Sequence, residues 1–406
     1  MKAFGFDWRW QASDELLNVE DYRRAARRRL PRMVWTYVEG GADDLRTVAG
    51  NRSAFDDWWL VPSVLAGHDT HDLATEVAGL PLSMPVLTAP TGFNGLTRWS
   101  GDLDAIRAAE RVGTRCVVST ASTWSVEEVA DAATEPHAFQ LYPGAGGVAA
   151  ALMRRAWAAG FRSLFVTVDV PTVGNREGEK REGMGVPPVL TPRRLLDVSR
   201  HPRWAYDVVR HRRIGGRNLA SGDGVTAALA SIEIQERHLV QSRLNWDDLA
   251  WMRDNWHGRL YIKGVLRAED AVRAVDLGLD GVVVSNHGGR QLDGCVPSVS
   301  ALPAVADAVA GRAEVLLDGG IRRGTDVLKA LALGADAVLI GRPCLYGMAV
   351  AGDRGVEHVL TILKSEIERG LTLLGVRDIR DLDRSHVRPV RGGERDEIGM
   401  STVTTQ

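Results

Sequence analysis

The sequence predicts an α/β protein, a (β/α)8 TIM barrel with a helical segment in front of it and a long loop after its fourth strand. Eight short β-rich runs follow one another from residue 84 onward, and helix-like stretches lie between most of them, as eight βα units require. Polar side chains stand at the end of every run, where the loops of a barrel share one open face. The runs are residues 84–89, 116–119, 138–141, 164–168, 260–263, 281–285, 315–317 and 337–340.

The chain is expected to form one domain over residues 1–406. Residues 1–80 form a mainly helical N-terminal segment, whose first helix spans 19–30 between Asn18 and Pro31, two residues typical of helix boundaries. The barrel covers residues 81–375, with helices at 102–112, 147–158, 268–277 and 325–333, and residues 376–406 form a C-terminal tail.

A long loop is predicted between the fourth and fifth strands, at residues 174–244, far longer than an ordinary βα loop. Two interpretations stay open: a solvated lid over the open face, or an amphipathic segment in peripheral contact with a membrane. Its basic residues outnumber Asp197 and Asp207, and apolar residues such as Leu195, Leu196 and Trp204 alternate with them. The arginines are Arg193, Arg194, Arg200, Arg203, Arg210, Arg212, Arg213 and Arg217.

Composition excludes several classes of protein. A hydrophobic content of 45% and a charged content of 25% are typical of globular proteins, and a net charge of −2 gives no electrostatic basis for binding nucleic acid. No apolar run approaches the ~20 residues of a membrane-spanning helix, and the N-terminus lacks the apolar core of a signal peptide, so we expect a cytoplasmic protein. Cys116, Cys295 and Cys344 lack metal-ligand spacing, and we expect reduced thiols and no metal site.

The strongest catalytic signal follows the sixth run, where SNHGGRQLD at residues 285–293 presents His287 and Arg290 three positions apart. An imidazole titrates near neutral pH and can accept a proton from a substrate, whereas a guanidinium binds a carboxylate bidentately. An isolated pair of this kind is more often a loop histidine beside a surface arginine. The other strand ends favour a site for a small acid that carries a removable hydrogen.

The loops after the seventh and eighth runs predict a phosphate site. Gly319, Gly320 and Gly341 allow close approach of the backbone to a ligand, and Arg322 and Arg342 supply positive charge. No GxGxxG motif in a βαβ frame supports a Rossmann fold. The polar residues of the other strand ends suit a flat heterocycle with several hydrogen-bonding edges, such as an isoalloxazine. They are Ser119, Gln140, Thr167 and Lys263, of which Lys263 could instead form a structural salt bridge.

These motifs together resemble the FMN-dependent L-2-hydroxy acid oxidase and dehydrogenase family over nearly the whole chain. SNHGGRQLD and LDGGIRRGTD are the most specific of them. The others are LPRMVWTYVEGGADD from Leu30, APTG, STAS, FQLY, TVDV, YIKGV and IGRP. The resemblance implies an FMN-containing barrel that oxidises an (S)-2-hydroxy acid to the 2-oxo acid, with histidine-assisted transfer of the Cα hydrogen to the flavin.

The resemblance also implies roles for individual residues. His287 becomes the catalytic base, Asp169 stabilises its protonated form, and Tyr142 lies near the substrate hydroxyl. Arg290 and Tyr37 are expected to bind the substrate carboxylate, and Arg176 matches a second, mobile arginine of the family. The expected FMN-binding residues are Pro90, Thr91, Gly92, Ser119, Gln140, Thr167, Lys263, Ser285, Asp318, Gly319, Gly320, Arg322, Gly341 and Arg342.

Two departures from the pattern of glycolate oxidase indicate the substrate and the electron acceptor. Ala121 stands where that enzyme carries tryptophan, which leaves space for an aromatic or bulky substrate such as mandelate. Gly92 replaces the alanine common in the oxidases, which favours an acceptor other than oxygen, such as a membrane quinone. The resemblance further implies a homotetramer.

Three alternatives remain. The first is an oxygen-using oxidase that acts on 4-hydroxymandelate or lactate. The second is an FMN enzyme of other chemistry on the same barrel. The third is a barrel that binds FMN or another ligand without turnover.

Overall fold

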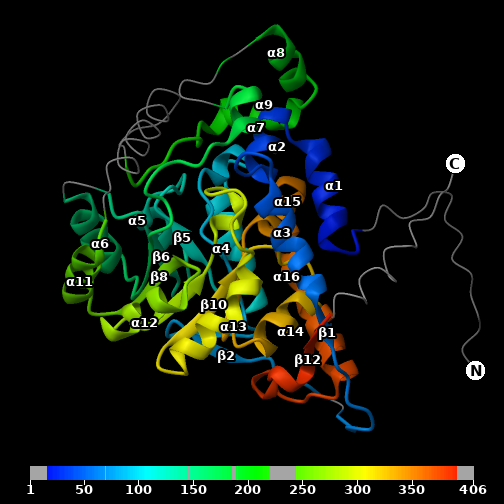
Figure 1. Ribbon diagram of the computed structural model, residues 1–406. Coiled ribbons are helices and arrows are strands. Elements are labelled where there is room, and N and C mark those ends of the chain that lie inside the picture. The colour runs from blue at the N-terminus through cyan, green and yellow to red at the C-terminus, as the bar shows by residue number, and fades with distance from the viewer. Residues whose placement is uncertain are drawn as a thin grey trace, which may run out of the picture.

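The computed structural model describes residues 16–68, 70–144, 147–184, 189, 191–219 and 244–390. Its centre is a sheet of eight parallel strands in the order β4-β11-β10-β9-β8-β7-β6-β5, and a parallel bridge between Thr88 and Cys116 brings its two edges together into a barrel (Figure 1). All eight predicted runs are strands. They are β4 Val86–Thr88, β5 Val117–Ser119, β6 Ala138–Leu141, β7 Ser163–Thr167, β8 Arg259–Val265, β9 Gly281–Val284, β10 Glu314–Asp318 and β11 Ala337–Ile340.

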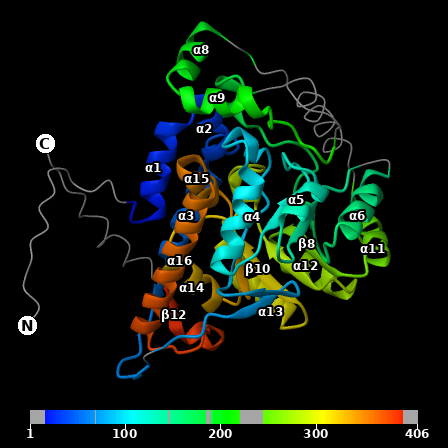
Figure 2. The same cartoon turned by 180° about the vertical axis from the view of Figure 1, so that it is seen from behind.

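Helices surround the barrel and confirm the predicted (β/α)8 architecture (Figure 2). The longest, α16 (Asp353–Leu374), packs against α4, α14 and α15. The other helices of this ring are α4 Gly101–Val112, α5 Val126–Ala132, α6 Val148–Ala158, α11 Trp246–Asn255, α12 Ala268–Asp276, α13 Ser298–Val309, α14 Gly324–Ala332 and α15 Arg342–Ala351.

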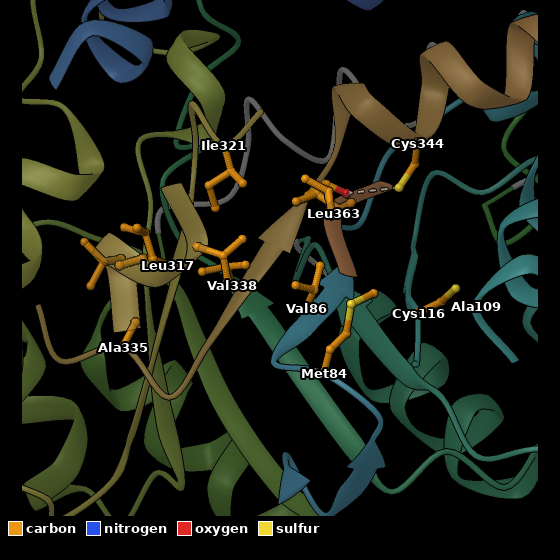
Figure 3. Packing of buried hydrophobic residues seen from close by; sticks show 14 of the residues in the cluster. Met84, Val86, Ala109, Cys116, Leu317, Ile321, Ala335, Val338, Cys344 and Leu363 are labelled. Carbon is orange, nitrogen blue, oxygen red and sulfur yellow. Dashed lines mark hydrogen bonds between the residues drawn. The ribbon is translucent and has the colours of Figure 1, made fainter. Parts of the chain in front are cut away.

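An apolar layer between the barrel and its helices forms the larger part of the core (Figure 3). Val86 and Val338 point outward from neighbouring strands and are fully buried against residues such as Leu363 of α16. Cys116 and Cys344 lie in the same layer as free thiols, and Cys295 is also a free thiol. Burial raises the pKa of Cys116 to about 12, so this thiol stays protonated.

The inside of the barrel is filled by the alternate residues of the same strands. Successive side chains of a strand point to opposite faces, so Leu87, Phe165 and Leu316 point inward while their neighbours pack against the helices. The rings of Phe165 and Tyr261 stack at 4.6 Å inside the barrel.

A short hairpin closes the bottom of the barrel. Strands β2 (Thr75–Val77) and β3 (Leu80–Leu82) are antiparallel and place Val77, Leu80 and Leu82 in the barrel interior. Ala78 and Gly79 both have positive φ, +58° and +66°, as a two-residue hairpin turn requires. The Ala78 amide donates to Glu314 Oε2 at 2.9 Å, which attaches the turn to β10.

The segment before the barrel is mainly helical over residues 16–53, as predicted. Helix α1 (Val19–Arg29) begins at Asn18, whose side chain accepts a hydrogen bond from the Asp21 amide at 2.9 Å. Helices α2 (Arg32–Glu39) and α3 (Arg46–Ser53) follow.

Beyond residue 53 the helical description of residues 1–80 is incomplete, because three strands lie there. Besides the hairpin, β1 (Trp58–Leu60) pairs antiparallel with β12 (Val387–Pro389). The start of the predicted C-terminal tail therefore returns to the N-terminal segment, and residues 391–406 lie outside the described residues.

The long loop carries helices at the C-terminal end of the barrel, namely α7 (Glu177–Arg181), α8 (Pro192–Ser199) and α9 (Pro202–His211) (Figure 1). Three contacts attach α9 to the barrel loops. The Trp204 Nε1 donates to the Leu96 carbonyl at 2.6 Å, and His211 stacks on Trp99 at 3.9 Å. The Arg213 guanidinium, just after α9, lies 4.0 Å from the Trp124 ring centroid.

Residues 185–188, 190 and 220–243 of this loop lie outside the described residues. Every helix in the described part of the chain is too short or too polar to cross a membrane.

Candidate active site

A cavity of about 480 Å³ opens at the C-terminal end of the barrel, where the sequence places its polar strand ends. Seven residues are expected to contact the substrate or act in catalysis, and all of them except Asp169 line this cavity. The lining residues are Tyr37, Ala121, Tyr142, Arg176, His287 and Arg290. Asp169 lies directly behind His287 and contacts it.

The alternation of the strands explains why the cavity floor is polar. Near the C-terminal end of each strand, the last inward-facing residue lies two positions after an apolar residue of the barrel interior. In six of the eight strands this residue is polar, so the interior changes from apolar to mainly polar at one level. In strand order from β4 to β11, these last inward-facing residues are Ala89, Ser119, Gln140, Thr167, Lys263, Ser285, Asp318 and Gly341.

His287 is held in an unusual backbone conformation above the end of β9. Its φ of +57° lies in the left-handed region, which costs about 1 kcal/mol or more for a residue with a side chain. Asn286 fixes this turn, because its side chain accepts from the Gly289 amide at 3.1 Å and exchanges two 2.8 Å hydrogen bonds with Asn51 of α3. The N-terminal segment therefore helps to fix the position of the imidazole.

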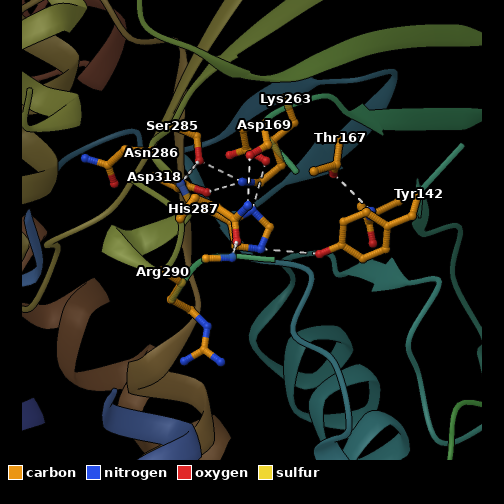
Figure 4. Close-up of polar contacts among 12 residues, drawn as sticks. Tyr142, Thr167, Asp169, Lys263, Ser285, Asn286, His287, Arg290 and Asp318 are labelled. Atoms are coloured by element: carbon orange, nitrogen blue, oxygen red, sulfur yellow. Dashed lines mark hydrogen bonds and ion pairs between the residues drawn. The ribbon is translucent and has the colours of Figure 1, made fainter. Parts of the chain in front are cut away.

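The imidazole lies between a carboxylate and a phenol (Figure 4). His287 Nδ1 is 2.9 Å from Asp169 Oδ1, and its Nε2 is 3.3 Å from the Tyr142 hydroxyl. Burial opposes ionisation of Asp169, but the charge and hydrogen bond of His287 and the ammonium of Lys263 hold the Asp169 pKa below its ordinary value. Burial raises the pKa of Tyr142, which stays protonated. Nε2 is therefore the nitrogen of His287 that faces the cavity.

Lys263 forms a buried ion pair at the cavity floor. Its Nζ is 2.6 Å from Asp318 Oδ2 and donates to Ser285 Oγ at 2.8 Å. Burial disfavours its charge, but Asp318 and Asp169 outweigh this effect and raise the Lys263 pKa. Lys263 thus forms a structural salt bridge and also places a fixed positive charge beside the cavity, so the two interpretations of this residue are compatible.

Arg290 is held by the N-terminal segment. Its Nη1 donates to the carbonyls of Tyr37 at 2.8 Å and Gly40 at 3.1 Å, and its guanidinium lies 5.0 Å from the Tyr37 ring centroid. The Tyr37 hydroxyl donates to the Gly92 carbonyl at 3.0 Å. Two residues predicted to share a carboxylate are therefore in contact, although 253 positions separate them in the chain.

Glu179 of α7 is a site residue that the sequence did not reveal. Its Oε1 accepts from Arg290 Nη2 at 2.9 Å, its Oε2 is 4.0 Å from Arg176 Nη1, and it lines the cavity. The available signal was its spacing of three residues from Arg176, which places both side chains on one face of a helical turn.

The phosphate end of the cavity contains two guanidiniums without a carboxylate partner among the described residues. Arg342 donates to the carbonyls of Val38, Gly40 and Gly288, and burial lowers its pKa to about 10. Among the described residues, the Arg322 guanidinium donates only to the Ile321 carbonyl, and its buried Nε has no hydrogen-bond partner. Such uncompensated charge fits a bound phosphate.

The predicted FMN residues divide into two groups by position. Eleven line the cavity, from Pro90 to Arg342, and three lie behind it. The three are linked to lining residues: Ser119 donates to Gln140, Gln140 donates to Thr167, and Ser285 accepts from Lys263. The hydrogen-bonding groups, the orphaned Asp318 Oδ1 and the unpaired arginines together fit FMN.

Part of the cavity lining is apolar. It includes Ala121, which is buried, and residues of the loop after β4 and of the long loop that the sequence did not assign to the site. Those of the loop after β4 are Phe93 and Leu96, and those of the long loop are Met184, Trp204, Val208 and Ile214. Trp204 and Val208 show that α9 covers the cavity with its inner face.

The fold and site define a class of protein, a barrel oxidoreductase that holds a phosphorylated flavin next to a base and a carboxylate-binding arginine. The chain matches the family model described as FMN-dependent dehydrogenase over residues 26–389, and it belongs to that family. It is therefore an FMN-dependent oxidoreductase that acts on hydroxy acids.

Two curated relatives illustrate the range of the family. An (S)-mandelate dehydrogenase from Pseudomonas putida is 42% identical over 93% of this chain and 95% of its own length. An L-lactate oxidase from a Nostoc species is 41% identical over 91% of this chain and 97% of its own length.

Two solved structures are also similar. The monotopic membrane protein (S)-mandelate dehydrogenase superposes with a TM-score of 0.89 at 40% identity, over 93% of this chain and all of that one. Mandelate oxidase with (S)-2-phenylpropionate gives 0.77 at 32% identity, over 93% and 99% of the two chains.

Proposed function

We propose that this enzyme oxidises an (S)-2-hydroxy acid with an aromatic or other bulky side chain, such as mandelate, to the 2-oxo acid. The observation that carries the proposal is that polar and apolar side chains line the same cavity. His287, Tyr142 and Arg290 line it together with apolar residues that include Ala121 and Trp204. A carboxylate, a hydroxyl and an aromatic ring each have a matching surface there. The names of the mandelate-oxidising relatives agree with this assignment.

In this proposal Arg290 binds the substrate carboxylate through its planar fork, with Arg176 and the Tyr37 hydroxyl nearby. The stacking of Arg290 on Tyr37 and its two carbonyl acceptors fix the guanidinium before substrate arrives. Positioning of this kind can contribute several kcal/mol to lowering a barrier.

His287 then accepts a proton from the substrate through Nε2, the nitrogen that faces the cavity and Tyr142. Asp169 fixes the tautomer through Nδ1 and stabilises the imidazolium, which its ionised state allows. FMN, when bound, supplies the two-electron acceptor for the Cα hydrogen. Pro90, Thr91, Gly92, Thr167, Lys263, Asp318, Gly319, Gly320, Arg322, Gly341 and Arg342 would contact it, and Ser119, Gln140 and Ser285 would support them.

The test is an anaerobic absorbance spectrum of the FMN-loaded enzyme with a panel of 2-hydroxy acids. We expect (S)-mandelate to bleach the flavin faster than L-lactate, and no bleaching by any 2-hydroxy acid would overturn the proposal. His287→Asn should give a yellow, FMN-loaded protein that mandelate does not bleach. Rapid bleaching of that variant would remove His287 from the role of base.

We further propose an electron acceptor other than oxygen, such as a quinone. Gly92 supports this, because the mandelate-oxidising dehydrogenase pattern has glycine at this position and the oxidases commonly have alanine. The rate of peroxide formation in air, measured against reduction of a quinone analogue, distinguishes the two acceptors. Formation of peroxide at the rate of substrate oxidation would identify an oxidase instead.

Assembly into a tetramer stays a prediction, which a measurement of the molecular mass in solution tests.

We also propose peripheral contact between the long loop and the surface of a membrane. Four large apolar side chains of α8 and α9 are more than half exposed to solvent: Leu195, Leu196, Tyr206 and Val209. Arginines surround them, and this combination is typical of an interfacial helix. Cell fractionation before and after a high-salt wash tests the contact. Protein found wholly in the soluble fraction at low salt would count against it.

A further inference from the structure

A second hollow lies outside the active site, between the end of α1, the loop after β4 and the start of α9. Its volume is about 740 Å³, within the range of about 300 to 1,000 Å³ typical of ligand sites. Figure 2 shows α1, α15 and α9 at the same end of the molecule. We refer to this hollow as the arginine cleft, because five arginines line it: Arg28, Arg29, Arg98, Arg200 and Arg203.

The charge of the arginine cleft is largely uncompensated. Asp207 is the single acidic residue among its lining residues, and Arg98 pairs with Asp104 at 3.2 Å. Arg29 donates to the Val350 carbonyl, which carries no charge. The described residues provide no ion pair for Arg28, Arg200 or Arg203. Like-charged guanidiniums that line one cleft repel each other, and an anion between them reduces this repulsion.

The chemistry of the lining selects the kind of anion. Guanidiniums bind phosphate through parallel N–H···O hydrogen bonds, and several can share the oxygens of one group. The cleft draws its arginines from three separate parts of the chain: α1, the loop after β4, and the junction of α8 and α9, where Arg200 directly follows α8 and Arg203 lies in the first turn of α9. One phosphate between them would join these parts.

The position of the cleft connects it to the active site. Trp204 lines both the arginine cleft and the active-site cavity, and its indole is anchored to Leu96, which also lines the cavity. A ligand that joins Arg28 of α1 to Arg203 of α9 would therefore hold α9 over the cavity.

We propose that the arginine cleft is a second anion site, separate from the FMN site, that binds a phosphate group and fixes α9 over the active site. The phosphate could come from a soluble phosphomonoester or from the headgroup of an anionic lipid. Tyr206 lines the cleft and is one of the exposed apolar residues of the proposed membrane-facing surface, so a headgroup could enter there. The proposal does not depend on membrane contact, because a soluble phosphate would satisfy the same arginines.

The test uses four FMN-loaded proteins, so that the cofactor occupies its own phosphate site. They are the unmodified enzyme, the cleft variant Arg28→Gln/Arg203→Gln, its charge-conserving counterpart Arg28→Lys/Arg203→Lys, and the control variant Arg27→Gln/Arg154→Gln. The control removes the same charge as the cleft variant, at exposed residues of α1 and α6 that do not line the cleft and do not belong to the long loop. The probes are glycerol 3-phosphate, followed by thermal unfolding, and vesicles of phosphatidylcholine with or without phosphatidylglycerol, followed by co-sedimentation.

We expect the cleft variant to bind at least one probe roughly tenfold more weakly than the unmodified enzyme, whereas the control binds it normally. Loss of glycerol 3-phosphate binding identifies a soluble phosphate, and loss confined to phosphatidylglycerol vesicles identifies a lipid headgroup. Equal losses in the cleft and control variants, or no loss in either, would overturn the proposal. Arg28→Lys/Arg203→Lys keeps the charge and should recover part of the binding, which separates a binding defect from a folding defect.

The bound probe should also protect α8 and α9 against thermolysin in the unmodified enzyme and in the control, but not in the cleft variant. Cleavage at an unchanged rate in the presence of saturating probe would show that the anion does not hold α9, and this part of the proposal would be wrong.

Discussion

Arg290 and Glu179 form an ion pair inside the cavity, with 2.9 Å between Nη2 and Oε1, and their side chains are only 15% and 10% exposed. Arg176 stands 4.0 Å from the same carboxylate. In the absence of substrate, Glu179 is thus the anion that compensates two arginines expected to bind the substrate carboxylate. The Glu179 carboxylate keeps both guanidiniums in place, but it competes with the substrate carboxylate for them and therefore lowers the affinity for substrate.

Glu179→Gln should therefore lower the stability of the substrate-free enzyme and increase its stabilisation by an anionic ligand. Loss of one charge from a buried pair costs about 3 to 5 kcal/mol, and a bound carboxylate would restore the compensation. The measurement is the melting temperature with and without a non-reacting 2-hydroxy acid analogue. Glu177→Gln is the matched control on the same helix, because its pair with Arg181 is exposed and contributes little. An identical ligand-induced shift in both variants would contradict this role of Glu179.

Asp169→Asn should reduce the rate of flavin reduction by about 10²- to 10⁴-fold while the protein keeps its FMN. The reason is that an amide cannot stabilise the imidazolium as the ionised carboxylate does. The rate of bleaching in a stopped-flow experiment gives this number. Because Asp169 acts through His287, the double variant with His287→Asn should be no slower than His287→Asn alone. Losses that multiply would show that Asp169 acts independently.

Ala121→Leu should change the substrate preference of the enzyme. Ala121 is buried against the apolar part of the cavity, and a β-carbon added at Gly92 would lie only 2.9 Å from its methyl group, so a larger side chain must take space from the cavity. We expect the ratio of kcat/KM for mandelate to that for lactate to fall roughly tenfold. An unchanged ratio, in a variant with a normal flavin spectrum, would show that the substrate side chain lies elsewhere.

The barrel could be predicted from the sequence because each of its strands carries a local signal, a short apolar run that ends in a polar residue. The hairpin β2-β3 and the pair β1-β12 carry no such signal. Their strands have three residues each, β3 contains Pro81, and Trp58 finds its partner Pro389 more than 300 positions away. The hairpin β2-β3 forms because its apolar side chains pack into the bottom of the barrel, and β12 forms because it pairs with β1 of the N-terminal segment. A local sequence pattern does not reveal such tertiary contacts.

The same limit applies to the site. His287, Arg290 and the polar strand ends follow from their place at the ends of strands, but Glu179 lies among several charged residues of similar appearance in residues 176–182. Trp204 and Tyr206 belong to one short helix, yet one lines the cavity and the other is 65% exposed. Both faces of α9 are apolar, so only the tertiary contacts show which face is inside.

Asp102, at the start of α4, is a buried carboxylate close to the cavity loops. It accepts hydrogen bonds from Asn94 Nδ2 at 2.9 Å and from the amide and hydroxyl of Thr123 at 3.0 and 2.8 Å. Burial raises its pKa to about 6 in spite of these bonds. Since an unfolded aspartate has a pKa near 3.8, ionisation of Asp102 favours the unfolded state. Its contribution to stability is complete below pH 4 and is lost as the pH rises toward 6.

Asp102→Asn should remove this pH dependence. The free energy of unfolding of the variant, relative to the unmodified enzyme, should rise by about 2 to 3 kcal/mol between pH 4 and pH 7, since one pKa unit corresponds to about 1.4 kcal/mol. The new amide has an acceptor available, because Asn94 Oδ1 is buried without a partner, so the substitution need not leave an unsatisfied donor. Urea unfolding of both proteins at pH 4, 5, 6 and 7 measures the difference. If the two curves stay parallel across this range, Asp102 ionises in the folded protein as it does in the unfolded chain, and its burial carries no electrostatic cost.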